Sequence, residues 1–350
     1  MSELIERLLS TRQSRGGKFD GLSLAGQDLS NCQLIECSFT NVDFTGCRLE
    51  RSVFIGCNLA GVSFAAAEMT ETIFQGCALD NAQFAGMSVK EAIFSKTSLV
   101  NANFSKAVLH ETAFDSADLT GTNFTEADLT KAAVLKSTTQ KTNFTKANLR
   151  RTTLAGLELS DAIFESSSLI EAYFEGSNLS GQAFTGCDLT STIFHKAKLA
   201  NAKFAKRELA GVFFSQADVS GADFSGSKLS QVSFEEAMLD KANLAGAQIE
   251  KSIFQKASLQ GTSFEGAVMT QCVFGGAKAT GGVWRQASIE QCELSGASLD
   301  GSDFTGAKLT RVNMHDVSQQ KTVWDKSVFV NVVGTDPERL AAQNWQAPKA

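Results

Sequence analysis

Large apolar side chains recur at every fifth residue along almost the whole chain. The 63 positions whose numbers end in 4 or 9, from Phe19 to Phe329, are all apolar except Thr139 and Gln319. A chain that is 43% apolar would place only about 27 apolar residues at these positions by chance. Helical spacing of 3.6 residues is absent, and strict alternation would break every five residues. The pattern therefore predicts a chain that turns a corner every five residues.

The residue two places before each large apolar position is usually small. From residue 22 to Val332 it is mainly Ala, Ser, Thr, Cys or Val, and the exceptions are Leu22, Gln27, Met87, Leu157, Gln182 and Arg207. Each five-residue unit thus points one large and one small side chain inward and three mostly polar ones outward. Four units close a coil of 20 residues, and successive coils hydrogen-bond at about 4.8 Å. Residues 18–333 are therefore predicted to form an all-β, quadrilateral parallel β-helix of about sixteen coils.

The type of large apolar residue tests the 20-residue period. Positions ending in 4 are mainly Phe and positions ending in 9 are mainly Leu, and the chain has 26 Phe against one Tyr and three Trp. A coil therefore has Phe on two opposite sides and Leu on the other two. Burying one such side chain contributes about 1.5–3 kcal/mol before conformational entropy is counted, so the repeat predicts a stable, dry core.

The cysteines follow the same register. All eight lie at the small inward position: Cys32, Cys37, Cys47, Cys57, Cys77, Cys187, Cys272 and Cys292. Buried free thiols behave as small hydrophobic groups, whereas zinc sites need clustered pairs of Cys and His. The spacing predicts reduced, structural thiols, no metal site and no cofactor, and reduced thiols fit the cytoplasm.

Charge and hydropathy narrow the function classes further. The formal net charge is −6, with 38 acidic and 32 basic residues interspersed, which argues against direct nucleic-acid binding. No stretch approaches the roughly 18 apolar residues of a membrane span, and the N-terminus lacks the apolar run of a signal peptide. We expect a cytoplasmic protein without a membrane span, with secretion by a signal-less route left open.

Several segments resemble a known repeat family. Ala-Asp-Leu-Thr-Gly at 117–121, Ala-Asp-Leu-Thr-Lys at 127–131 and Ala-Asn-Leu-Arg-Arg at 147–151 look like the repeating unit of pentapeptide repeat proteins. The resemblance covers roughly residues 18–333 and implies a right-handed quadrilateral β-helix. Some members of this family mimic duplex DNA and protect or inhibit DNA gyrase, and others belong to bacterial secretion or effector-delivery systems.

The two ends depart from the repeat. Leu4, Ile5, Leu8 and Leu9 have helical spacing, so residues 1–17 are expected to form a capping helix and a linker. Residues 334–350 are expected to form a short helix and a tail, with Asp336 and Pro337 at the helix start and the helix running from Glu338 to Gln346. Capping of the last coil is favoured for this helix, and a role in a homodimer, as in gyrase-protecting relatives, is the alternative.

Two internal places also break the pattern. Lys131–Thr142 has weak apolar positions at Val134 and Thr139, and Arg207 occupies a small inward position. Because a charge cannot lie unpaired in a dry interior, we expect a bulge that carries the Arg207 head to solvent near Glu208. Either place could bend or interrupt the helix.

Function must come from the outward columns. One column is rich in apolar residues, which are Val53, Ile73, Ile93, Tyr173, Ile193, Phe213, Ile253 and Val273, and Ile35, Ile55 and Leu135 extend it sideways. Exposed apolar stripes mark partner surfaces, although β-branched residues also suit exposed strands. The stripe favours a non-enzymatic scaffold or adaptor that binds another protein or a second copy of itself, and a bacterial secretion or effector-delivery assembly is one setting for it. The alternative is a DNA-mimicking modulator or protector of gyrase or topoisomerase.

Catalytic residues are not evident in the sequence. The three histidines are His110, His195 and His315. His195 and His315 fall on one side but six coils apart, about 29 Å at the strand spacing, which is too far for a nucleophile and its base. The glycines fall at corners, as at Gly56 and Gly276, and form no phosphate-binding loop. We therefore expect no enzymatic activity.

Overall fold

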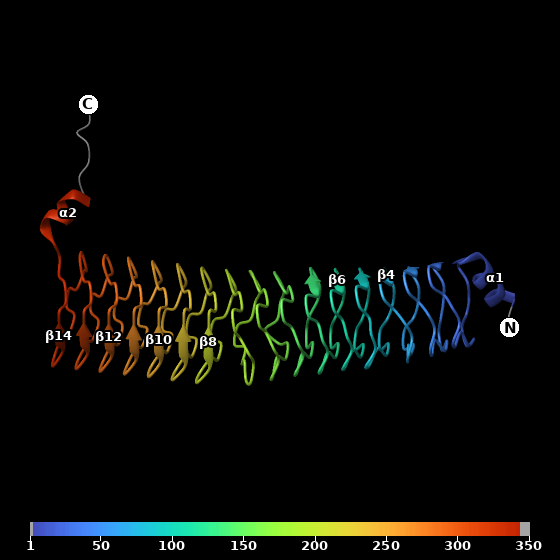
Figure 1. Cartoon of the computed structure of the whole chain (residues 1–350), viewed down its shortest axis with the longest axis horizontal. Helices are drawn as coiled ribbons and strands as arrows, with labels where there is room; N and C mark the ends of the chain where they lie inside the picture. The colour runs from blue at the N-terminus through green and yellow to red at the C-terminus, as the bar shows by residue number, and fades with distance from the viewer. Residues whose placement is uncertain (1–2, 344–350) are drawn as a thin grey trace, which may run out of the picture. The chain divides into compact units, whose positions relative to one another are not determined.

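The computed structural model describes residues 3–343, and they form a parallel β-solenoid of about sixteen coils with a short helix at each end (Figure 1). Outward residues whose numbers end in 3 or 8 pair in parallel with the residue 20 places later, as in Lys18 with Ser38, Ser23 with Asp43 and Asp28 with Arg48. The predicted coil of 20 residues and the predicted fold class are therefore confirmed. The described chain divides into two compact units, which are treated separately below.

The first unit, Met1–Asn178 with Phe184–Asp188, contains one helix and one flat parallel sheet. Helix α1 spans Glu3–Thr11. The sheet has the order β1-β2-β3-β4-β5-β6-β7. Its strands are β1 (Gln13–Arg15), β2 (Gln33–Ile35), β3 (Val53–Ile55), β4 (Ile73–Gln75), β5 (Ile93–Ser95), β6 (Ala113–Asp115) and β7 (Ala133–Leu135).

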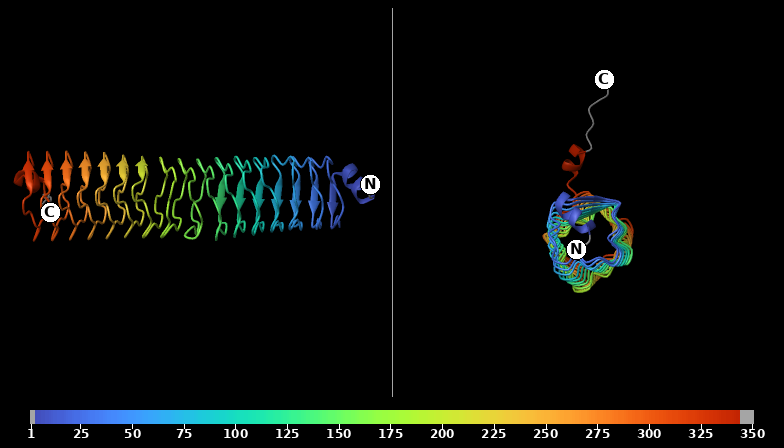
Figure 2. Two further views of the ribbon diagram at one scale, coloured as in Figure 1. Left: turned by 90° about the horizontal axis from the view of Figure 1, so that it is seen from below. Right: turned by 90° about the vertical axis from the view of Figure 1, so that its right-hand side faces the viewer.

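The second unit, Leu179–Ala183 with Leu189–Ala350, has its own parallel sheet. The strand order is β14-β13-β12-β11-β10-β9-β8 (Figure 2). The strands are β8 (Glu208–Ala210), β9 (Lys228–Ser230), β10 (Gln248–Glu250), β11 (Val268–Thr270), β12 (Ser288–Glu290), β13 (Lys308–Thr310) and β14 (Val328–Val330), and helix α2 spans Pro337–Gln343. On the other sides of the coils, neighbouring turns join through single bridges.

The large inward side chains stack on one another from coil to coil. The Phe94 ring lies parallel to the rings of Phe74 and Phe114, with centroids 5.2 and 5.1 Å away. It meets Phe84 and Phe104 edge-on at 6.0 and 5.8 Å. Stacked and edge-to-face pairs are the favourable arrangements of aromatic rings. The interior is thus an aromatic ladder in which each ring contacts its neighbours above, below and beside it.

The small inward positions hold the backbone as well as filling space. Hydroxyl and thiol groups there donate to a carbonyl oxygen 23 residues earlier: Thr72 to Leu49 O at 2.8 Å, Thr122 to Leu99 O at 2.8 Å and Cys47 to Leu24 O at 2.7 Å. A buried polar group costs little when it has a hydrogen-bond partner. This explains why Ser, Thr and Cys share these positions with Ala and Val.

The corners need left-handed backbone, which only some residues tolerate well. Gly56 and Gly276 adopt φ values of 60° and 65°, as expected for the residue without a Cβ. Lys251 and Glu91 adopt the same conformation at other corners, with φ of 50° and 56°. The left-handed corner residues are therefore mostly polar or Gly, with Ala66 (φ 56°) an exception.

The two helices differ in how far they cover the apolar residues at the ends of the solenoid. Ile5 and Leu8 of α1 are only 4% and 1% exposed, so the N-terminal helix covers the first coil as expected. At the other end Phe329 occupies an inward position but is 48% exposed, and all three residues of β14 are exposed. Figure 1 shows α2 leading away from the last coil. The expectation that the C-terminal helix caps this coil is therefore wrong for the residues described.

Helix α2 begins as the sequence predicts. The Asp336 carboxylate accepts hydrogen bonds from the backbone N–H groups of Glu338 at 2.9 Å and Arg339 at 3.2 Å, the pattern of an N-cap. Pro337 is the first helical residue. The predicted continuation to Gln346, including Trp345, lies outside the described residues.

The two predicted irregularities have different outcomes. At Thr139 the side-chain hydroxyl, rather than the backbone N–H, donates to Glu158 O at 2.7 Å, and a cavity of about 300 Å³ opens beside it between Lys136 and Glu158. At Arg207 the backbone is regular, because Lys228 N donates to Arg207 O at 2.8 Å. Glu208 pairs with Lys228 at 2.7 Å. The expected bulge at Arg207 is therefore wrong, although the Arg207 side chain is half-buried and so reaches solvent in part.

The cysteines are free thiols, and all are buried except Cys187, which is half-buried. Burial raises the pKa of the Cys47 thiol to about 11, which suppresses the reactive thiolate. A hydrogen bond with the neighbouring Cys57 thiol lowers the pKa of Cys77, but that side chain is only 2% exposed.

We expect one of the eight thiols to react rapidly with an aromatic disulfide reagent in the native protein, and all eight after unfolding in urea. Thiolate formation and access to the reagent are both needed for this reaction, and only Cys187 has partial access. The absorbance of the released thiol counts the reacting groups, and a Cys187→Ser variant should show none in the native state. Rapid reaction of several thiols in the folded protein would contradict the buried register.

Candidate protein-binding surface

The sheet of the first unit presents a cluster of aliphatic side chains on its outer face. The residues before and after each central inward residue point outward, so each strand contributes two outward positions. The parallel register places Val53 beside Ile73 and Ile73 beside Ile93, and it places Ile35 beside Ile55. We call these five residues, Ile35, Val53, Ile55, Ile73 and Ile93, the aliphatic patch.

The patch is accessible over four neighbouring strands, β2 to β5. Ile93 is 39% exposed, and the other four side chains are half-buried against one another. Further along the same sheet the outward column continues with Ala113 and Ala133, and Leu135 beside them is 39% exposed. The surface is therefore a contiguous apolar group on a regular parallel sheet, as suits a complementary protein surface.

The other predicted residues occupy equivalent outward positions. Tyr173 lies in the first unit, is half-buried and donates a hydrogen bond from its hydroxyl to Glu175. In the second unit Ile193 pairs with Phe213 and Ile253 pairs with Val273. Phe213 is 46% and Ile253 is 39% exposed, but Ser233 separates the two pairs. The second unit thus has a thinner apolar column than the first.

Some exposed apolar side chains lie outside the predicted stripe. Ile163, Met238 and Val268 are 46%, 46% and 49% exposed, each at an outward position among polar neighbours. Val323, Val328 and Val333 are exposed around the last coil. Their outward register was visible in the sequence, but single apolar residues on a surface are common, so the repeat gave no reason to select them.

Charged residues on the outer columns are arranged as opposite pairs from coil to coil. Arg51 lies 3.2 Å from Glu71, and Lys131 lies 2.9 Å from Glu111. The hydrogen bond and the positive charge of Lys131 lower the pKa of the Glu111 carboxyl. The short acidic run of Glu71, Glu91 and Glu111 is therefore neutralised at both ends, so this column presents mixed rather than uniform charge.

The histidines are not assembled into a reactive site in the described structure. His195 Nδ1 lies 2.9 Å from Ser215 O, and His315 Nδ1 accepts from the Asp336 N–H at 3.1 Å. Within residues 3–343, no three His, Cys, Asp or Glu side chains are grouped so that they could hold a metal ion. Neither α1 nor α2, the helices of that range, is long and apolar enough to cross a membrane.

Solved structures with related repeats share limited sequence with this chain. HetL, a pentapeptide repeat protein involved in heterocyst differentiation regulation in Nostoc sp. PCC 7120, is 23% identical, with coverage of 74% of this chain and 94% of that chain and a TM-score of 0.20. Rfr23 from Cyanothece 51142 is 20% identical, with 44% and 91% coverage and a TM-score of 0.24. QnrB1, a plasmid-mediated fluoroquinolone resistance protein, is 17% identical, with 84% and 93% coverage and a TM-score of 0.16.

Family models match most of the sequence. The model of the pentapeptide repeat region matches residues 27–102, 87–164, 167–244 and 187–264. The model of pentapeptide repeats in eight copies matches residues 252–282 and 285–317. Comparison with curated proteins gives no match. The repeat models cover well over half of the chain, which therefore belongs to the family of pentapeptide repeat proteins.

Proposed function

We propose that this protein is a non-enzymatic scaffold or adaptor that docks another protein on the aliphatic patch. The observation that carries the proposal is the register of the patch, which aligns Val53, Ile73 and Ile93 on consecutive coils of one parallel sheet. The pentapeptide repeat solenoid is a scaffold fold of generally non-catalytic proteins. Its coil-to-coil hydrogen bonds hold the outer side chains in place before any partner arrives, which lowers the entropic cost of binding.

Burying the aliphatic patch against a partner is expected to lower the free energy relative to leaving the patch in water. Burying apolar surface contributes about 25 cal/mol per Å², and side chains on a preformed sheet lose little freedom on binding. The half-buried aliphatic side chains beside Ile93 form one contiguous group rather than scattered exposures. A partner with its own apolar face would cover the group and leave the charged corner residues at a polar rim.

The charge pattern is less suited to the alternative of DNA mimicry. A mimic of duplex DNA needs a dense negative face, because DNA carries one charge per about 1.7 Å of its axis. Here acidic and basic residues pair along the outer columns, as in Arg51 with Glu71 and Lys131 with Glu111. We therefore rank modulation of gyrase or topoisomerase below the scaffold function. A secretion or effector-delivery assembly is one setting in which the proposed scaffold would act.

Site-specific photo-crosslinking tests the proposal. A photoreactive phenylalanine analogue placed at Ile93 should capture one dominant protein in the cells that make this chain, because the side chain lies in the patch. The same analogue at Gln83, which is exposed half a coil away on another side, is the matched control. The captured protein is then purified and bound to this chain in isolation.

The proposal requires capture that depends on the position and on the apolar character of the patch. Adding Val53→Lys and Ile73→Lys should abolish capture at position 93, since the charges prevent an apolar partner from burying the surface. Capture of the same proteins from positions 83 and 93, or capture that survives both lysines, would refute docking on the patch. Thermal melting confirms that the lysine variant remains folded.

A further inference from the structure

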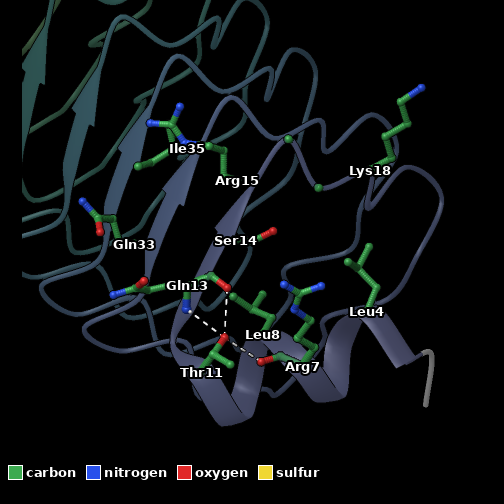
Figure 3. Close-up of a pocket in the computed structure, with 12 residues that line it drawn as sticks. Leu4, Arg7, Leu8, Thr11, Gln13, Ser14, Arg15, Lys18, Gln33 and Ile35 are labelled. Carbon is green, nitrogen blue, oxygen red and sulfur yellow. Dashed lines mark hydrogen bonds between the residues drawn. The ribbon is translucent and has the colours of Figure 1, made fainter.

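A pocket of about 590 Å³ lies between helix α1 and the first strand, at the N-terminal end of the solenoid (Figure 3). Its walls come from α1, β1, the residues 16–18 that follow β1, and β2. In Figure 3, Ser14 projects from β1 into the space above the helix, and Leu4 and Leu8 stand on the helix side. The pocket is large enough for several side chains of a bound segment.

The pocket exists because the first coil departs from the repeat on this side. Ser14 pairs with Leu34 in the parallel register and so occupies the place where later coils carry Leu or Phe. Gly17 takes the adjacent small inward position, and a Cβ there would lie 2.5 Å from Ser14 Oγ. The Phe19 ring also lies 2.6 Å from that Cβ position, so the space beside Gly17 is filled, and it is the short Ser14 side chain that leaves room where later coils carry Leu or Phe.

The lining of the pocket is positively charged in a chain that is acidic overall. It includes Arg7, Arg15 and Lys18 and contains no acidic residue. Among the described residues, Arg7, Arg15 and Lys18 form no ion pair, although the charge of Lys18 attracts the carboxylate of Asp20 without a direct contact. Nearby arginines are paired, Arg12 with Asp28 and Arg48 with Glu50 and Glu68. The charges at the pocket are therefore available for an external anionic group.

One strand edge beside the pocket is also open. β1 is the terminal strand of its sheet. Both edge groups of Gln13 are satisfied locally by Thr11 Oγ1, the N–H at 3.3 Å and the C=O at 3.0 Å, whereas the Gly16 N–H donates to Ile35 O at 2.8 Å in the next coil. Because successive backbone groups of a parallel strand point to opposite neighbours, the N–H and C=O of Arg15 face the open edge. These groups can pair with an added strand.

From these features we propose that the pocket binds a short acidic segment of a partner polypeptide as an extra strand along β1. Backbone groups of the segment pair with Arg15, and its carboxylates lie near Arg7, Arg15 and Lys18. An apolar side chain of the segment packs against Leu4 on the helix side of the pocket. This site is distinct from the aliphatic patch, although Ile35 belongs to the patch and also lines the pocket.

Binding of a synthetic peptide tests the proposal. The probe is a fluorescein-labelled six-residue peptide of alternating valine and glutamate, titrated with the full chain while fluorescence anisotropy is recorded. The same peptide with lysine in place of glutamate should bind at least about tenfold more weakly, since it places like charges together. Raising the salt concentration should weaken binding of the glutamate peptide, because exposed charge pairs are screened.

Two variants separate the pocket from the rest of the surface. Arg15→Glu with Lys18→Glu should weaken binding of the glutamate peptide about tenfold or more, as expected for reversing two exposed charge contacts. Lys96→Glu with Lys136→Glu makes the same change of charge at exposed corners of the same unit and should leave binding unchanged. Ile73→Lys with Ile93→Lys should also leave it unchanged, so failure of the patch and failure of the pocket are distinguishable.

N-methylated probes test the added strand. Methyl groups on alternate amides block one edge of a strand, so one of the two possible methylation patterns should abolish binding and the other should not. Retention of binding with both patterns, or competition by inorganic phosphate alone, would show a simple anion site and overturn strand addition. Equal affinity for the wild-type chain and the Arg15→Glu, Lys18→Glu variant would overturn the pocket itself.

Discussion

Replacing Phe94 with Ala should lower the free energy of unfolding by about 3–5 kcal/mol, as for other phenylalanines removed from packed interiors. The Phe94 side chain is fully buried, and its ring stacks between Phe74 and Phe114. Its removal leaves a void that touches four other rings. Because the coils above and below hold the backbone in place, the void cannot collapse easily. The midpoint of urea unfolding, followed by circular dichroism, measures the loss.

A leucine at the same position provides the control. Leu154 and Val134 occupy the column of Phe94 in later coils and are fully buried there. Phe94→Leu should therefore cost only about 1 kcal/mol, as for other exchanges between apolar residues of similar volume. A loss below about 1 kcal/mol for Phe94→Ala would mean that the ring does not lie in a packed interior.

Replacing Ala102 with Phe should destabilise the fold by about 3 kcal/mol, because a ring would be forced into a position that admits only small side chains. Ala102 is fully buried, as are Ala82 and Thr122 at the same position of the neighbouring coils. The added ring must either displace the aromatic ladder or separate two coils. Separation of coils would break their backbone hydrogen bonds, including Asn103 N to Ala82 O at 3.0 Å.

Ala102→Thr is the matched control for this overpacking. Thr122 and Thr142 occupy the same column and donate to the carbonyl oxygens of Leu99 and Leu119. A threonine at 102 has the equivalent acceptor in Leu79 O and should change the unfolding free energy by less than about 1 kcal/mol. If Phe and Thr at this position gave the same urea midpoint, the alternation of large and small inward residues would not describe the core.

The coil and its inward register could be predicted because they rest on a repeat that contains no insertion. Phe94, Thr122 and Cys47 all lie where the five-residue pattern places them. The pattern could not predict which side of the coil carries extended strands. These lie at Gln13–Arg15 and its repeats in the first unit, and at Glu208–Ala210 and its repeats in the second. All four sides share one sequence pattern, so small differences in backbone geometry decide between a strand and a single bridge.

The ends and the candidate sites were harder to predict for a related reason. Phe329 follows the inward register, but burial needs a further coil or a cover above it, and α2 provides neither. The N-terminal pocket depends on Ser14, which lies just before the periodic positions begin. The aliphatic patch was predicted as part of a longer stripe. In the structure, the contiguous part of the stripe lies on β2 to β5, and Ile93 is its most exposed residue.

The affinity of the crosslinked partner for defined variants tests the proposed scaffold most directly. Isothermal calorimetry with the purified partner should show binding to the wild-type chain and binding at least about 100-fold weaker to Ile73→Lys with Ile93→Lys, because central apolar contacts dominate protein interfaces. Ser63→Lys with Gln83→Lys adds the same charge at exposed outward positions on the opposite side, and its dissociation constant should stay within about twofold of the wild-type value. Equal weakening by both pairs, or unchanged binding by the patch variant, would contradict the account.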